Sequence, residues 1–113
     1  MQRIYTMVAH RVEWVKHLRM DDQQIRNRIV EKMIRDGPIT GGNKTTIDTA
    51  VNKYLPSHEQ GRGKTLIDEM LADPDSPIEG YGGGGRQNIR LEGVPKAVEY
   101  LKANDGNVPF GYD

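Results

Sequence analysis

The segment Asp73–Gly93, with the sequence DPDSPIEGYGGGGRQNIRLEG, constrains the fold more than any other part of the chain, because it predicts a β-hairpin. Its tip consists of four consecutive glycines, Gly82–Gly85. Ile78 before the tip, and Ile89 and Leu91 after it, supply the short apolar alternation of strands with one buried face. Glycine tolerates positive φ, so such a tip can be long and can approach the backbone of a partner closely.

Helices are predicted on both sides of the hairpin, because apolar residues recur at helical spacing. An N-terminal helix is expected over residues 1–20. Its apolar stripe consists of Ile4, Val8, Val12, Val15 and Leu18. A second helix is expected to be capped by Asp21 or Asp22, with Gln24 completing a capping box if Asp21 is the cap, and to stop before Gly37 and Pro38. Pro38–Thr40 is expected to form a short first strand.

Two further helices are expected before the hairpin and one after it. The third has the capping pattern Thr45-x-x-Asp48, and the fourth repeats it as Thr65-x-x-Asp68. The polar run Ser57–Gly63 is expected to separate these two helices. The last helix has Pro95 in its first turn. From the apolar faces we expect a set of mostly buried residues: Ile29, Met33, Val51, Leu66, Met70, Ile89, Leu91 and Val98.

The resulting order of elements is α, α, (β), α, α, β, β, α, and over residues 21–103 it resembles the winged helix-turn-helix family of DNA-binding domains. The resemblance lies in pattern and spacing. It implies a mainly α fold with a small β-hairpin, preceded here by the extra N-terminal helix. In that family the helix nearest the hairpin reads DNA and the hairpin is the wing. The connection from Leu55 to Lys64 is longer than the usual three- or four-residue turn. Either it is an extended turn, or the two helices do not form this motif.

The resemblance also implies which residues contact DNA. Arg62, Lys64 and Thr65 would lie at the N-terminal end of the recognition helix, where backbone N–H groups favour phosphate and an arginine can pair with guanine. Tyr81, Arg86 and Gln87 would belong to the wing. Asp68 and Glu69 would repel phosphate if they faced the groove.

Charge gives this interpretation only modest support, because the 113-residue chain has sixteen Lys and Arg against sixteen Asp and Glu. The first 36 residues carry a net +3, and the rest of the chain compensates. Any contact with nucleic acid must therefore come from local clusters. A neutral domain of this pattern is also compatible with a protein-interaction module that uses the same face without binding DNA.

Enzymatic and metal-dependent functions find little support in the sequence. Gly61–Thr65 contains a GKT triplet, but a phosphate-binding loop needs a glycine at position 58, where the chain has His58. His10, Glu13 and His17 fall near one helix face without a further ligand in sequence reach. No nucleophile and base are arranged for catalysis, so we expect no enzyme, no cofactor and no metal.

The expected partners are double-stranded DNA and a second copy of the chain. The stripe of the N-terminal helix either packs on its own domain or pairs with the same helix of another chain, which would place two recognition helices on successive half-sites. No apolar run reaches the roughly 18 residues of a membrane span, so no membrane partner is expected. The chain has no cysteine, and we expect a cytoplasmic setting. Residues 104–113 are expected to form a tail, attached loosely unless Phe110 or Tyr112 docks.

Overall fold

The computed structural model describes residues 20–81 and 88–112. Its elements follow in this order: α2 (Asp22–Arg35), β1 (Thr45–Thr46), α3 (Ile47–Tyr54), the 3-10 turn η1 (Ser57–Glu59), α4 (Gln60–Ala72), β2 (Ile78–Gly80), β3 (Asn88–Leu91) and α5 (Val94–Ala103). The described part is mainly helical with a small antiparallel sheet, as the sequence predicts. The predicted N-terminal helix and the four-glycine tip lie outside the described residues.

Helix α2 begins and ends where its sequence predicts. The Gln24 N–H donates to the carboxylate of Asp21 at 2.8 Å, and the Asp21 N–H donates to the side chain of Gln24 at 2.9 Å. This reciprocal capping box satisfies two backbone donors that the helix itself leaves unpaired. The buried face of α2 consists of Ile25, Ile29, Val30, Met33 and Ile34.

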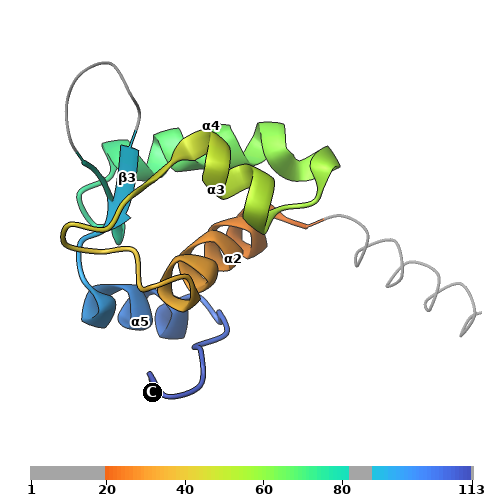
Figure 1. Cartoon of the computed structure of the whole chain (residues 1–113). Helices are drawn as coiled ribbons and strands as arrows, with labels where there is room; N and C mark the ends of the chain where they lie inside the picture. The colour runs from red at the N-terminus through yellow and green to blue at the C-terminus, as the bar shows by residue number, and fades with distance from the viewer. Residues whose placement is uncertain (1–19, 82–87, 113) are drawn as a thin grey trace, which may run out of the picture.

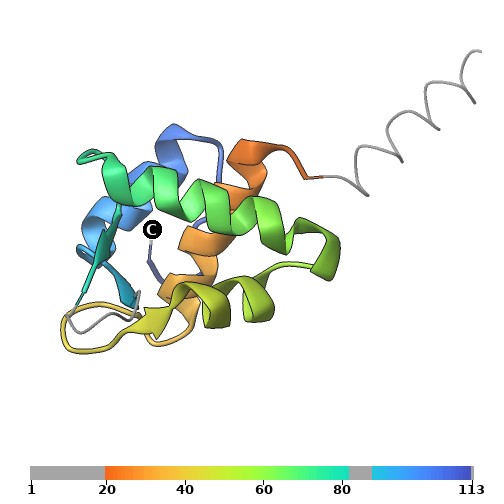
Figure 2. The same cartoon turned by 90° about the horizontal axis from the view of Figure 1, so that it is seen from above.

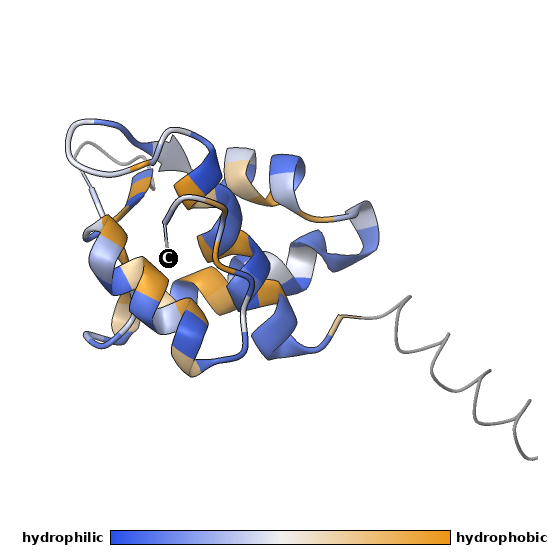
Figure 3. Ribbon diagram, turned by 90° about the horizontal axis from the view of Figure 1, so that it is seen from below, coloured by the Kyte–Doolittle hydropathy of each residue, from blue (hydrophilic) through white to orange (hydrophobic). Residues whose placement is uncertain are grey.

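The core forms where α2 packs against α3, α4, α5 and the inner face of the sheet. All eight residues predicted to be buried are buried, with Val98 the most exposed of them at 8%. The buried residues of α2 and α5 are all apolar, and Figure 3 shows hydrophobic and hydrophilic residues alternating along the helices. The helical spacing of apolar residues was therefore a sufficient guide to the core.

The sheet has the strand order β1-β3-β2, and both pairings are antiparallel. Ile78 pairs with Leu91, and Thr45 pairs with Ile89. The predicted first strand at Pro38–Thr40 is wrong, because the paired strand is β1. The earlier segment makes only one isolated bridge, between Thr40 and Leu91.

The predicted capping patterns of the third and fourth helices are shifted or absent. Helix α3 is capped by Thr46, whose hydroxyl accepts from the Thr49 N–H at 3.0 Å, so Thr45 is free to pair in the sheet. Thr65 caps nothing, because it lies inside α4, and its hydroxyl donates to the Gly61 carbonyl at 3.4 Å.

The connection between α3 and α4 is shorter than the sequence suggests. Only residues 55–59 separate the two helices, and three of them form η1. The polar run continues as helix because its side chains lie on the exposed surface of α4, while Gly63 faces α3. A Cβ on Gly63 would overlap Leu55 and would lie 3.2 Å from Val51. Glycine here permits the close approach of the two helices.

After the sheet, α5 packs on α2, and the following segment is better attached than predicted. The Gly106 N–H donates to the Leu101 carbonyl at 2.7 Å, and the side-chain amide of Asn27 donates to the Asn104 carbonyl at 2.9 Å. Pro109 is buried, whereas the Phe110 side chain is fully exposed. Val108 also packs against the core, so the attachment combines polar bonds to α2 and α5 with apolar packing and does not use the aromatic side chain of Phe110.

The base of the hairpin and the start of α2 lie at opposite ends of the described part of the molecule. Figures 1 and 2 show the sheet and the base of the hairpin at one end and the start of α2 at the other. Helix α3 leads away from the sheet, and α4 returns toward it. The first turn of α4 therefore lies near the start of α2, and its last turn lies near β2.

Candidate nucleic-acid interface

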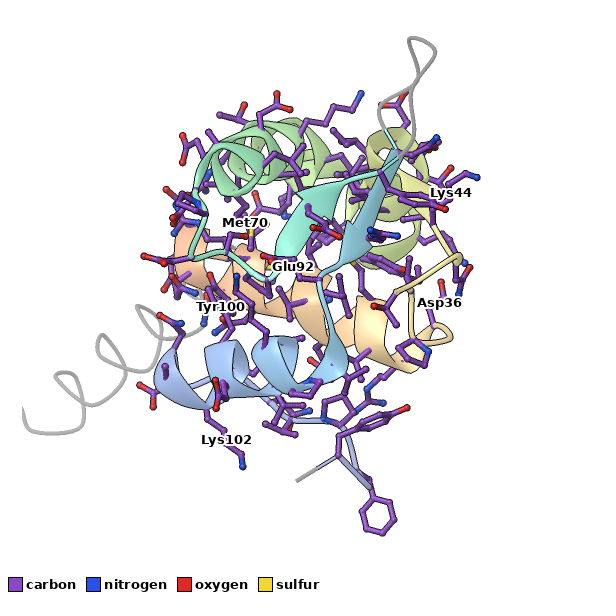
Figure 4. All side chains as sticks on the ribbon, turned by 90° about the vertical axis from the view of Figure 1, so that its left-hand side faces the viewer. Asp36, Lys44, Met70, Glu92, Tyr100 and Lys102 are labelled. Atoms are coloured by element: carbon purple, nitrogen blue, oxygen red, sulfur yellow. The ribbon has the colours of Figure 1, made fainter. Side chains whose placement is uncertain are left out.

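The base of the hairpin carries an aromatic ring with two cations beside it. Tyr81 follows β2, and its N–H donates to the Asn88 carbonyl at 2.9 Å. The guanidinium carbon of Arg90 lies 4.1 Å from the centre of the Tyr81 ring, and the Lys44 ammonium lies 5.5 Å from it. Both distances are within the range of cation–π attraction. We call Lys44, Tyr81 and Arg90 the hairpin-base cluster; Figure 4 shows Lys44 beside the end of the sheet from which the tip leaves.

Arg90 is held in this cluster by two further contacts. It lies opposite Glu79 in the β2–β3 register, and its Nε donates to the Glu79 carboxylate at 2.7 Å. Its Nη1 donates to the Gly41 carbonyl at 2.6 Å. Because Ile89 and Leu91 on either side are fully buried, strand alternation places Arg90 on the outer face of the sheet. The cluster therefore presents a fixed guanidinium on an outer surface.

Lys64 lies on the flank of α4 that faces α3. Its ammonium is 2.9 Å from the carboxylate of Asp48, in the first turn of α3. The two side chains are 52% and 76% exposed. An exposed ion pair of this kind contributes little free energy, so the lysine is available to exchange its partner. Asp48 closely follows β1, which connects this pair to the hairpin end of the surface.

Arg62 lies on the other flank of α4, facing α2. Its Nη1 donates to the Met20 carbonyl at 3.2 Å, and its Nη2 forms an ion pair with Asp22. Residues two apart on a helix do not share a face. Arg62 and Lys64 therefore contact different helices and do not form one surface.

The part of α4 between these flanks that faces solvent is poor in cations. Gly61, Thr65, Asp68 and Ala72 recur at spacings of four and three and are all exposed. Thr65 is thus the one predicted site residue on this outward stripe. The stripe contains an acidic residue and no basic one, which is unfavourable for close contact with phosphate.

Of the six predicted site residues, Arg86 and Gln87 lie outside the described residues. The remaining four are divided between Arg62 at one end of the molecule, Lys64 and Thr65 on α4, and Tyr81 at the hairpin base. The sequence analysis missed Lys44 and Arg90. Alternation with Ile89 and Leu91 was a usable signal for Arg90, but the position of Lys44 depends on how the loop after Gly41 returns to the sheet.

The described residues carry eleven Lys and Arg against fourteen Asp and Glu, a net −3. Residues 1–19 carry four against one, a net +3. The chain is thus neutral as a whole but divided into a basic N-terminal segment and a mildly acidic body. Non-specific attraction to DNA would therefore depend on the N-terminal segment and on local cations.

A separate polar cluster at the C-terminal ends of α2 and α3 perturbs two titrations. Lys53 and the Tyr54 hydroxyl both donate to one oxygen of Asp36, each at 2.8 Å. The hydrogen bond from Lys53, followed by that from Tyr54, lowers the pKa of Asp36 below 3.8. Burial, followed by the bond to Asp36, raises the pKa of Tyr54 far above its ordinary value of 10. Tyr54 is therefore a neutral donor at all physiological pH values.

The described residues form neither a phosphate-binding loop nor a metal site. Gly61–Thr65 is helical and does not form a phosphate-binding loop. Among residues 20–81 and 88–112, no group of three or more His, Cys, Asp or Glu side chains is arranged to hold a metal ion. No helix within that part of the chain has the length and apolar character needed to cross a membrane.

Comparison with known proteins gives no match: no protein-family model fits the chain, and no curated protein or solved structure is significantly similar to it.

Proposed function

We propose that this chain is a DNA-binding protein of the winged helix-turn-helix type, with α3 and α4 as the helical pair and the β2–β3 hairpin as the wing. The observation that carries the proposal is the hairpin-base cluster on the outer face of a sheet ordered β1-β3-β2. A wing presents cations to the DNA backbone; Arg90 belongs to β3 of this hairpin, and Lys44 lies beside the hairpin base. Arg86 and Gln87, which follow the four glycines in the sequence, are further proposed contacts.

In this proposal the wing makes a larger contribution than the recognition helix. Lys64 contributes a phosphate contact from α4, exchanging Asp48 for the DNA backbone, and Thr65 is an exposed residue of the outward stripe of α4. The acidic stripe residue Asp68 keeps α4 from lying deeply against phosphates. Arg62 is excluded from this interface because it faces α2.

The proposed regulator acts as a dimer through residues 1–19, whose apolar stripe pairs with a second copy. Deletion of these residues is then expected to yield a monomer by light scattering. A full-length chain that is already monomeric at micromolar concentration contradicts the dimer.

The proposal is tested by fluorescence anisotropy with a random-sequence duplex at two salt concentrations. We expect the affinity to fall with salt, because bound lysine and arginine release counterions from DNA. The Lys44→Gln variant is expected to reduce the slope of log K against log salt by about 0.9, the value for one phosphate contact. The matched control is Lys102→Gln, which removes the same charge from α5; Figure 4 shows Lys102 far from Lys44. Equal effects of the two variants contradict a site at the hairpin base.

A second candidate function is a protein-interaction module without DNA binding. It is favoured by the cation-free outward stripe of α4 and by the net −3 of the described residues. Absence of salt-dependent duplex binding in the same titration supports this candidate over the first.

A further inference from the structure

A polar hollow of about 320 Å³ lies where α4 and α5 pack on α2. Helix α2 lines it with Gln23 and Arg26, α4 with Glu69 and Met70, and α5 with Tyr100. Met70 and Tyr100 are labelled in Figure 4. The volume is at the lower end of the range for ligand sites, so the hollow suits a small molecule.

Two hydroxyl groups of the lining have protons that no acceptor within residues 20–81 and 88–112 takes up. Ser76, between α4 and β2, is 3% exposed, and its oxygen accepts from the Ile78 N–H at 3.2 Å. The Tyr100 oxygen accepts from the side-chain amide of Gln23 at 3.0 Å. Each hydroxyl therefore accepts one bond and keeps its own O–H to donate. An unpaired buried donor is costly, so these groups favour an acceptor inside the hollow.

One wall of the hollow carries an ion pair that is only loosely closed. Arg26 Nη2 lies 3.4 Å from the Glu69 carboxylate, and Arg26 Nη1 donates to Gln23 at 3.4 Å. Strong bonds between charged groups are shorter, at about 2.7–2.9 Å. The Arg26 and Glu69 side chains are 25% and 59% exposed, so their mutual attraction is weak. A ligand can therefore separate them at little cost.

The charges of the lining select a ligand that carries both signs. An anion would pair with Arg26 and leave the Glu69 carboxylate without a cation, and a cation would do the reverse. Breaking one partner away from a shielded ion pair is unfavourable. A zwitterion inserted between the two side chains pairs with both. Asp73, which also lines the hollow, is a further acceptor for an ammonium group.

We propose that this hollow binds a free α-amino acid, whose carboxylate and ammonium group are attached to one carbon. Arg26 receives the carboxylate, and Glu69 receives the ammonium. Gln23 is bonded to both Arg26 and Tyr100, so the Tyr100 hydroxyl lies along the same wall and donates to the carboxylate as well. Ser76 donates to an oxygen of the ligand's side chain. The site does not depend on DNA binding, because neither Lys44 nor Arg90 lines it.

The site is tested by amide NMR of the full chain, with each of the common L-amino acids added separately at millimolar concentration. We expect at least one to shift the side-chain amide signals of Gln23 and Asn104, both of which line the hollow. The signal of Asn52, exposed on α3, is the internal control and should not move. No such shift with any of the amino acids overturns the proposal.

The requirement for both charges is tested with acetate and methylammonium, which carry one charge each. Each is expected to bind at least about tenfold more weakly than the amino acid, because it forms one charged contact instead of two. An affinity equal to that of the amino acid for either probe overturns the zwitterion. L-threonine and L-valine have the same shape, and threonine is expected to bind about fivefold more tightly, the value of one hydrogen bond. Equal affinities overturn the part assigned to Ser76.

The position of the site is tested by Arg26→Gln, which is expected to weaken amino-acid binding about tenfold or more. Arg28→Gln is the matched control, because it removes the same charge from α2 at an exposed residue outside the lining. Glu69→Gln is expected to weaken amino-acid binding but to strengthen acetate binding, since Arg26 loses its competing partner. Circular dichroism establishes that each variant is folded. Equal effects of Arg26→Gln and Arg28→Gln, or weaker acetate binding in Glu69→Gln, overturn the site.

Discussion

At the hairpin end of the molecule, Arg90 and Lys44 lie beside an aromatic ring on the outer face of a sheet. At the opposite end, Arg62 is bound to the carbonyl of Met20 and to Asp22. All three are cations in a chain of zero net charge, and composition alone does not distinguish them. The difference lies in what each cation contacts: Arg90 and Lys44 flank the Tyr81 ring, whereas Arg62, whose side chain is 49% exposed, bonds the Met20 carbonyl and an acidic side chain at the start of α2.

The comparison teaches that a basic residue near a helix start is not by itself a nucleic-acid contact. From the sequence, Arg62 was a candidate for pairing with guanine, yet in the structure it bonds the start of α2. Lys64, two positions later, faces α3 and remains exposed. Arg62 and Lys64 are 49% and 52% exposed, but they point toward different helices, and Arg62 also donates to the Met20 carbonyl.

The largest expected effect comes from removing the core that supports both ends. Leu66 of α4 is 4% exposed. Leu66→Ala is expected to lower the free energy of unfolding by ~2–5 kcal/mol, the range for truncating a buried large aliphatic residue. Urea denaturation measures the loss of unfolding free energy, and the hairpin end and the start of α2 should lose stability together. A loss under 1 kcal/mol would mean that α4 is not packed as described.

A smaller effect is expected from the two glycines of α4. Gly63→Ala is expected to destabilise the fold by ~1–3 kcal/mol, because its methyl group would overlap Leu55 in a well-packed contact. Gly61→Ala is the matched control, since nothing lies within 4 Å of a Cβ built there. It is expected to stabilise α4 by up to ~1 kcal/mol. Equal effects in urea denaturation would show that the α3–α4 contact does not require glycine.

At the C-terminal end of α2, the neutral hydroxyl of Tyr54 donates a hydrogen bond to Asp36. Tyr54→Phe is expected to cost about 1 kcal/mol at pH 7, the net value of one hydrogen bond. The pKa of Asp36 is lowered in the fold, so its contribution is present above 3.8 and is lost as the pH falls through the lower folded value. Stability of parent and variant should therefore converge as the pH falls below 3.8 and through the lowered pKa of Asp36. A pH-independent difference contradicts this assignment.

The smallest expected effect compares two ion pairs on the candidate interface. Glu79 and Arg90 are 36% and 27% exposed, whereas Lys64 and Asp48 are more than half exposed. Double-mutant cycles are expected to give a coupling free energy toward ~1 kcal/mol for the first pair and toward ~0.2 kcal/mol for the second. The reverse order would mean that Lys64 is held to Asp48 and is not available to DNA.

Sequence alone determined the presence of the four described helices, their buried faces and the two strands of the hairpin, because these depend on the spacing of apolar residues and on local capping. Helix α2 is the clearest case, since Asp21 and Gln24 define its start and five apolar residues define its buried face. Local patterns were misleading where two signals competed. Thr45 and Thr46 are both suitable caps, and pairing of Thr45 with Ile89 decided between them.

Only the tertiary structure decided the start of α4, the first strand and the composition of the candidate interface. In the sequence, Gly61 and Gly63 indicate a break in the helix. In the structure, Gly63 lies within α4, where the close approach of Leu55 and Val51 leaves no room for a Cβ. Lys44, Tyr81 and Arg90 meet because a loop and two strands converge, and Arg62 is occupied because α2 begins beside it. Contacts between segments that are distant in sequence leave no periodic signal, whereas a helix repeats its pattern every turn.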